Sequence, residues 1–240
     1  MKLFIFCFSL LLSSYGLHFV LEIYNINSLL YFICVIIFYG VWLFIANKFK
    51  GYSISELVDS KFNLNFKLLL LGLLGSLGLI LIDFSVNEIL FKLNPKHFRE
   101  LSEFNVLILF YIIVCSFFEE ILFRKFLIST LAKKYRPAKA ILISAFVFMI
   151  GHIFHTNFIV VFFSGLIYGY MYWISKSWFL CFVIHALTNS VIILLDELKI
   201  SGFNFSFLEM PYYVFGMLLG ISLLWYSLFL LKSKVKQLET

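Results

Sequence analysis

An apolar run from Val106 to Leu131 contains two adjacent carboxylates, Glu119 and Glu120, and a guanidinium at Arg124. A run of this length is long enough to cross a bilayer as a helix. Ionisable side chains at membrane depth are costly, so they usually face a cavity or a partner and mark a functional position. The run therefore predicts a membrane helix whose charged side chains face the inside of a helical bundle.

Helical spacing separates the two acids. Glu120 and Arg124 lie one turn apart with the acid first, which favours an ion pair. Glu119 points about 100° away from Glu120, so Arg124 does not easily pair with both. We predict that Glu120 is structurally paired and that Glu119 is available for chemistry. The alternative is that both acids only lock helices together.

The composition of the whole chain is that of a polytopic membrane protein. Of its 240 residues, 62% are hydrophobic and 13% are charged, whereas a soluble domain carries roughly 25% charged residues. The net charge of +6 does not indicate nucleic acid, because the basic residues lie between apolar runs. The four cysteines lie inside apolar stretches without CxxC spacing, which excludes a disulfide framework as the basis of the fold.

Eight apolar runs predict an all-α membrane bundle of about eight transmembrane helices. We expect spans near residues 3–20, 27–45, 66–84, 106–131, 140–154, 158–173, 178–195 and 212–231. The first run is interpreted as an uncleaved helix, with a signal peptide as the alternative. Small residues at helical spacing predict close helix packing; these are Gly72, Gly75 and Gly78 in the third span and Gly165 and Gly169 in the sixth.

The distribution of basic residues predicts the orientation. If the N-terminus is inside, the inner connections and the tail carry most of the lysines and arginines between the spans. The positive-inside rule then places both termini in the cytoplasm, in a multi-pass protein of the cell membrane. We find no internal repeat, which disfavours a transporter built from inverted halves.

Two later spans carry polar side chains one helical turn apart. Phe148 and His152 lie in the fifth span, and His185 and Asn189 share a face of the seventh. A single intramembrane histidine is often only a hydrogen-bonded packing residue, and we place His155 at the membrane interface. Three helices that contribute a Glu-Glu pair, a histidine and a His/Asn pair are able to activate water and stabilise an oxyanion, as peptide hydrolysis requires.

These three motifs, in this order, resemble the signature of the CAAX protease and bacteriocin-processing (CPBP) family of intramembrane peptidases, which includes the type II CAAX prenyl endopeptidases and abortive-infection-like proteins. The motifs are E-E-x-x-x-R from Glu119, F-x-x-x-H ending at His152, and H-x-x-x-N from His185 to Asn189. The resemblance implies a catalytic helical core at residues 101–195. N-terminal helices and loops occupy residues 1–100, and a C-terminal helix with a basic tail occupies residues 196–240.

The resemblance also implies a role for each motif. Glu119 would be the general base that activates the attacking water, and His152 would help to hold that water. His185 and Asn189 would polarise the scissile carbonyl and stabilise the tetrahedral oxyanion. The ion pair of the first motif would keep the second acid in place.

The need for a metal stays open at this stage. Two histidines and a glutamate are chemically adequate zinc ligands, but they come from three separate helices without an HExxH motif. Asn189 is a poor zinc ligand and a good oxyanion donor. We therefore favour a metal-free glutamate peptidase with no required cofactor, and keep zinc as the alternative.

The sequence thus predicts an intramembrane endopeptidase that cleaves a membrane-associated protein or peptide. We expect its active site in the inner half of the bilayer, open to the cytoplasm. The expected partners are this substrate and the lipid bilayer, with no nucleic acid. A non-catalytic immunity or scaffold protein is the main alternative, and a small proton-coupled transporter is a weaker one.

Overall fold

The computed structural model describes residues 6, 9, 10, 13, 16 and 17 and the ranges 28–50, 65–93, 106–152, 157–200 and 209–239. These residues form helices and short connections without a strand, which confirms the all-α prediction for this part of the chain. Five of the described helices are long and apolar enough to cross a membrane by length and composition. The total of about eight spans stays a prediction, since most of the first apolar run lies outside the described residues.

The helices follow the predicted order but differ at their ends. Their bounds are α2 Ser28–Lys50, α4 Phe66–Leu93, α5 Val106–Glu120, η2 Ile121–Ile128, α6 Ser129–Leu131, α7 Pro137–Ile150, α8 Phe158–Ser175, α9 Trp178–Ile200 and α10 Met210–Glu239. Two segments outside the expected spans are helical: the stretch from Ser85 to Leu93 in α4, and Asp196 and Glu197 in α9. Hydropathy ends a span at its first polar residues. In α4, however, Ser85 is buried against neighbouring helices, so the helix continues.

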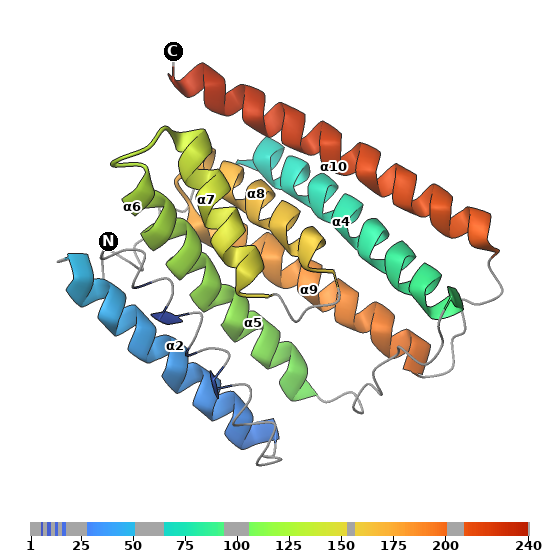
Figure 1. The fold of residues 1–240 in the computed structure, drawn as a ribbon, viewed down its shortest axis with the longest axis horizontal. Coiled ribbons are helices and arrows are strands. Elements are labelled where there is room, and N and C mark those ends of the chain that lie inside the picture. Colours follow the sequence, from blue (N-terminus) through green and yellow to red (C-terminus); the bar gives the residue numbers. More distant parts are fainter. Residues whose placement is uncertain are drawn as a thin grey trace.

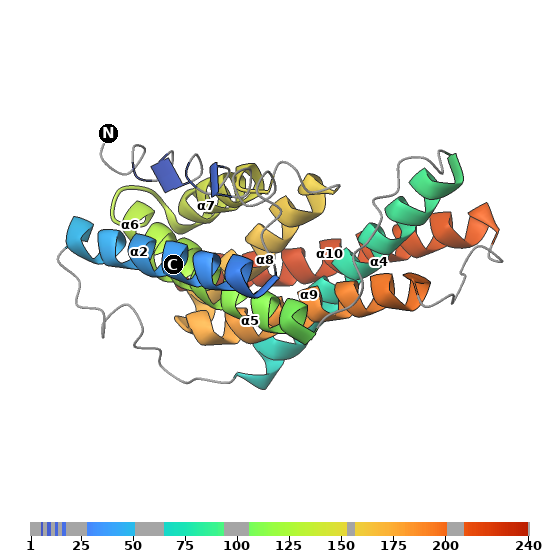
Figure 2. The ribbon, with the colours of Figure 1, turned by 90° about the horizontal axis from the view of Figure 1, so that it is seen from below.

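The helices form a layered bundle in which the middle helices enclose the core. Figure 1 shows α2 and α10 along opposite edges, with α5 to α9 and α4 between them. Among the described elements, α8 contacts α4, α7, α9 and α10. Figure 2, turned by 90°, shows α7 on the upper side of the bundle and α5 and α9 on the lower side. The motif residues lie on α5, on η2, which continues it, at the end of α7 and on α9.

Small residues allow α4 and α10, which both lie outside the motif segment, to pack closely. A Cβ atom on Gly78 of α4 would lie 2.7 Å from the carbonyl oxygen of Gly220 on α10, and a Cβ on Gly220 would lie 2.7 Å from the carbonyl oxygen of Gly78. The Ser227 hydroxyl donates to the carbonyl of Leu71 at 2.8 Å in the same interface. The predicted packing role of the third span is confirmed: Gly78 packs against α10, Gly75 against α8 and α10, and Gly72 against α8 and α9.

The glycines of the sixth span pack α8 against α7. A Cβ atom on Gly165 would lie 3.0 Å from the Cα of Ala145, and one on Gly169 would lie 2.7 Å from Cγ2 of Ile141. This contact confirms the predicted packing face. It also holds α7, the helix that leads into His152, against the centre of the bundle.

Candidate active site

The helix that carries the two acids changes its winding immediately after them. α5 ends at Glu120, and the backbone continues as the π-helix η2 before it returns to α-helix in α6. π-Helices are rare and occur frequently at functional sites. The buried Ser144 of α7 donates to the carbonyl of Phe123 in η2 at 3.1 Å. No proline or glycine marks this stretch, so its sequence predicts regular α-helix, and the wider turns are a correction.

Glu120 and Arg124 form the predicted ion pair in a fully buried position. Arg124 Nε donates to Oε2 of Glu120 at 2.8 Å, and Nη2 donates to Oε1 at 3.2 Å. Neither side chain has any exposed surface. The guanidinium carbon lies 5.0 Å from the ring centre of Phe148 and 5.7 Å from that of Tyr168. Two-point pairing and flanking aromatic rings are the surroundings in which a buried charge is tolerated.

His185 of α9 lies between the two acids. Its Nδ1 is 2.9 Å from Oε1 of Glu120, and its Nε2 is 3.8 Å from Oε2 of Glu119. The ring of Tyr168 stacks on the imidazole at 5.1 Å between centres. Because a carboxylate only accepts hydrogen bonds, the contact with Glu120 assigns the proton to Nδ1 and turns Nε2 towards Glu119.

His152 approaches Glu119 from the end of α7. Its Nε2 lies 3.8 Å from Oε1 of Glu119, and its Nδ1 lies 2.9 Å from the carbonyl oxygen of Phe148. A carbonyl accepts but does not donate, so Nδ1 carries a proton and Nε2 of the neutral ring is an acceptor. The structure thus brings His152 close to Glu119, as the family resemblance implies.

Asn189 is placed beside this centre by its helix, not by a contact. It lies one turn after His185 on α9 and is half-buried. Its carboxamide makes no hydrogen bond with the described residues. The structure therefore unites the two acids, Arg124 and both histidines, with Asn189 next along the same helix. His155 falls outside the described residues.

A residue outside every motif contacts the unpaired acid. The hydroxyl of Tyr39 on α2 donates to Oε1 of Glu119 at 3.1 Å. Its ring is parallel to that of Phe118, with 5° between the planes and 5.4 Å between the centres. Tyr39 is one of 13 tyrosines and lies in an apolar run, so its sequence context does not distinguish it.

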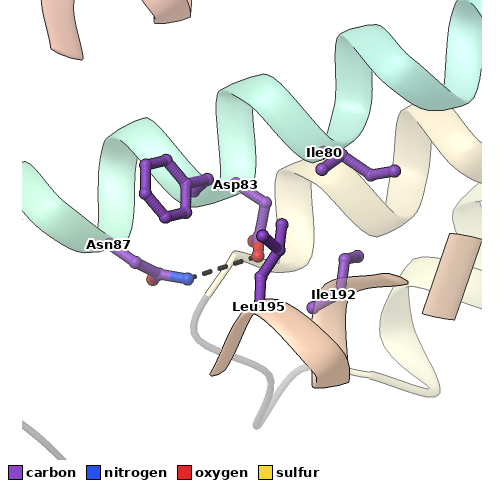
Figure 3. A pocket seen from close by; sticks show the side chains of 6 residues that line it. Ile80, Asp83, Asn87, Ile192 and Leu195 are labelled. Carbon is purple, nitrogen blue, oxygen red and sulfur yellow. Dashed lines mark hydrogen bonds between the residues drawn. The ribbon is translucent and has the colours of Figure 1, made fainter. Parts of the chain in front are cut away.

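A second buried polar cluster joins α4 to the start of α8. Asp83, which is 4% exposed, accepts hydrogen bonds from Asn157 Nδ2 at 2.6 Å and from Asn87 Nδ2 at 3.2 Å. Figure 3 shows Asp83 and Asn87 beside a small cavity that Ile192 and Leu195 of α9 also line. Asn157 directly precedes α8, so the cluster links the start of α8 to α4.

The arrangement of side chains around Glu119 gives limited support to the zinc alternative. No group of three or more His, Cys, Asp or Glu side chains in the described part of the chain is arranged to hold a metal ion. The zinc alternative thus rests on the residue types of Glu119, His152 and His185 alone.

The helices define a multi-pass membrane protein with a buried glutamate–arginine–histidine centre. The family model described as type II CAAX prenyl endopeptidase Rce1-like matches residues 101–191. The matched segment contains all three motifs, which confirms the family resemblance. No curated protein and no solved structure matches the chain.

Proposed function

We propose that this protein is an intramembrane endopeptidase that hydrolyses a peptide bond in a membrane-associated protein or peptide. The observation that carries the proposal is the convergence on Glu119 of two histidines from separate helices, each 3.8 Å away. The other acid, Glu120, is already engaged by Arg124 and His185. The family match over residues 101–191 supports the same class of reaction.

In this proposal Glu119 acts as the general base. The 3.8 Å between its Oε1 and Nε2 of His152 is too long for a direct hydrogen bond. A water molecule that bridges the two groups would donate one hydrogen bond to the carboxylate and the other to the imidazole nitrogen. Glu119 then removes a proton as the water oxygen attacks the scissile carbonyl, while the carbonyl of Phe148 keeps the His152 ring oriented. When the tetrahedral intermediate collapses, the C–N bond breaks and the protonated Glu119 returns this proton to the leaving amine.

His185 and Asn189 are proposed to stabilise the oxyanion. A doubly protonated His185 has one N–H for Glu120 and a second, at Nε2, that is available on the Glu119 side. Asn189, one turn further along α9, supplies an amide donor to the same face. Donors held in place by a buried scaffold stabilise developing negative charge without reorganisation. The Arg124–Glu120 pair then acts on His185, because it fixes the carboxylate that holds Nδ1.

We propose that the site lies in the inner half of the plasma membrane and opens to the cytoplasm. The excess of basic residues on the connections assigned to the inside supports this orientation, with both termini cytoplasmic. The substrate would reach the site from the membrane, as a protein or peptide anchored near the inner surface.

Cleavage of a membrane-tethered peptide library by purified protein in proteoliposomes tests this function. We expect cleavage by the wild type, loss of cleavage in Glu119→Gln, and wild-type cleavage in Glu209→Gln, which alters an exposed acid before α10. Equal cleavage by the wild type and Glu119→Gln would refute the general-base role. Failure of the folded wild type to cleave any peptide would favour the scaffold alternative.

A further inference from the structure

We propose that Tyr39 is a positioning residue for the general base, so that α2, a helix outside the family-matched segment, completes the active site. The inference rests on the proposed function of Glu119. It assigns a role to the N-terminal part of the chain, where no motif lies. Its basis is the 3.1 Å hydrogen bond from the Tyr39 hydroxyl to Oε1 of Glu119.

The hydrogen bond fixes the carboxylate in a defined orientation. Oε1 of Glu119 accepts a hydrogen bond from the Tyr39 hydroxyl and faces Nε2 of His152, while Oε2 faces Nε2 of His185. A carboxylate without this donor is free to rotate about its terminal bond, which is a soft torsion. With Oε1 held, both oxygens keep their places relative to the two histidines, and a bridging water meets the base in one geometry.

Aromatic packing holds Tyr39 in place. Its ring lies parallel to Phe118, the residue directly before Glu119, so the stacking partner and the acceptor come from one short segment of α5. The neighbouring Phe38 meets the Tyr39 ring edge-on, with 5.6 Å between centres. A tyrosine has few rotatable bonds, so a clamped ring presents its hydroxyl at little entropic cost.

The contacts of α2 indicate that its inner face serves this site. Among the described helices, α2 packs mainly against α5 and also touches η2. Val35 and Trp42 are buried at 3% and 9% exposure on the same stripe as Tyr39. The opposite side is open, with Ile37 at 60% exposure. Within this peripheral helix, Tyr39 is the residue that hydrogen-bonds to a motif side chain in the described structure.

A matched pair of variants separates positioning from packing. Tyr39→Phe keeps the stacked ring and removes only the hydroxyl. Tyr31→Phe makes the same change elsewhere between the same helices, where Tyr31 pairs with Tyr111 at 5.7 Å between ring centres. We expect kcat to fall about tenfold in Tyr39→Phe with KM unchanged. Tyr31→Phe should keep both constants, and 4-aminophenylalanine at position 39, which restores a donor, should recover most of the rate.

The outcomes for Tyr39 and for the proposed function are distinguishable. If the wild type cleaves and Glu119→Gln does not, equal kcat values for Tyr39→Phe and the wild type overturn the inference and leave the function intact. Thermal unfolding gives a second test that needs no cleavage. Tyr39→Phe should lower the Tm of the wild type but not that of Glu119→Ala, which lacks the acceptor. Equal Tm losses in the two backgrounds would overturn the inference even if no substrate were found.

Discussion

Removal of the Arg124 side chain is expected to destabilise the protein strongly. In Arg124→Met, Glu120 would lose both hydrogen bonds from the guanidinium, at 2.8 and 3.2 Å, in a position without exposed surface. Breaking a buried pair by removing one partner costs about 3–5 kcal/mol. Nδ1 of His185 remains 2.9 Å from Glu120 and offsets part of this loss, so we expect about 3 kcal/mol.

This loss corresponds to a fall in Tm of about 6–12 °C for a chain of this size. Thermal unfolding of the detergent-solubilised protein measures it directly. Arg124→Lys should give a smaller fall, because an ammonium keeps the charge but not the planar two-point contact. The double variant Glu120→Leu/Arg124→Met should recover most of the loss, since it leaves no unpaired buried charge.

The matched control is Arg136→Met, which removes an exposed arginine just before α7 and should leave the Tm unchanged. A Tm for Arg124→Met within about 2 °C of the wild type would refute the reasoning. So would a double variant that is no more stable than Arg124→Met. Either result would mean that the Glu120 carboxylate does not depend on this pair.

Three further predictions concern packing, the second polar cluster and metal dependence. Gly78→Ala should lower the free energy of unfolding by about 1–3 kcal/mol, because the new Cβ would meet the Gly220 carbonyl. Gly40→Ala, where a new Cβ meets nothing within 4 Å, should be neutral or stabilising in an unfolding assay. Equal Tm values for the two variants would contradict the close contact at Gly78. Asp83→Leu removes the acceptor that Asn157 Nδ2 reaches at 2.6 Å and keeps only the longer contact of that amide, 3.2 Å to Asn87 Oδ1, so both the Tm and the cleavage rate should fall. Asp83→Asn, which keeps an acceptor, should lower them less, and identical losses would exclude the hydrogen bond as the cause. A zinc chelator should leave the initial cleavage rate unchanged, and loss that added zinc restores would place a metal in the site.

Local spacing was sufficient to predict the parts of the site that lie on one helix. The i, i+4 rule identified the Glu120–Arg124 pair and left Glu119 for other contacts, as the structure confirms. The order of the motifs predicted that His152 and His185 meet Glu119, because a family resemblance carries tertiary information that spacing alone lacks. The catalytic role of each residue stays a prediction.

Contacts between helices that are distant in the sequence have no local sequence signal. Tyr39 and Glu119 are 80 positions apart, and Asn157 and Asp83 are 74 apart. A tyrosine within an apolar run carries no sign of its partner. The third span is expected to end near residue 84, whereas α4 continues to Leu93, and Asp83 is buried within it with two amide partners. The π-helix after Glu120 also could not be predicted from the sequence, since the same residue types form ordinary α-helix.

Cleavage of a tethered substrate in heavy-oxygen water tests the central claim most directly. If Glu119 activates a water molecule, the wild type should place one heavy oxygen atom in the new carboxylate of the N-terminal fragment, and Glu119→Gln should release no labelled fragment. Labelled product formed by Glu119→Gln at the wild-type rate would contradict the account, because hydrolysis would then proceed without the carboxylate that both histidines face.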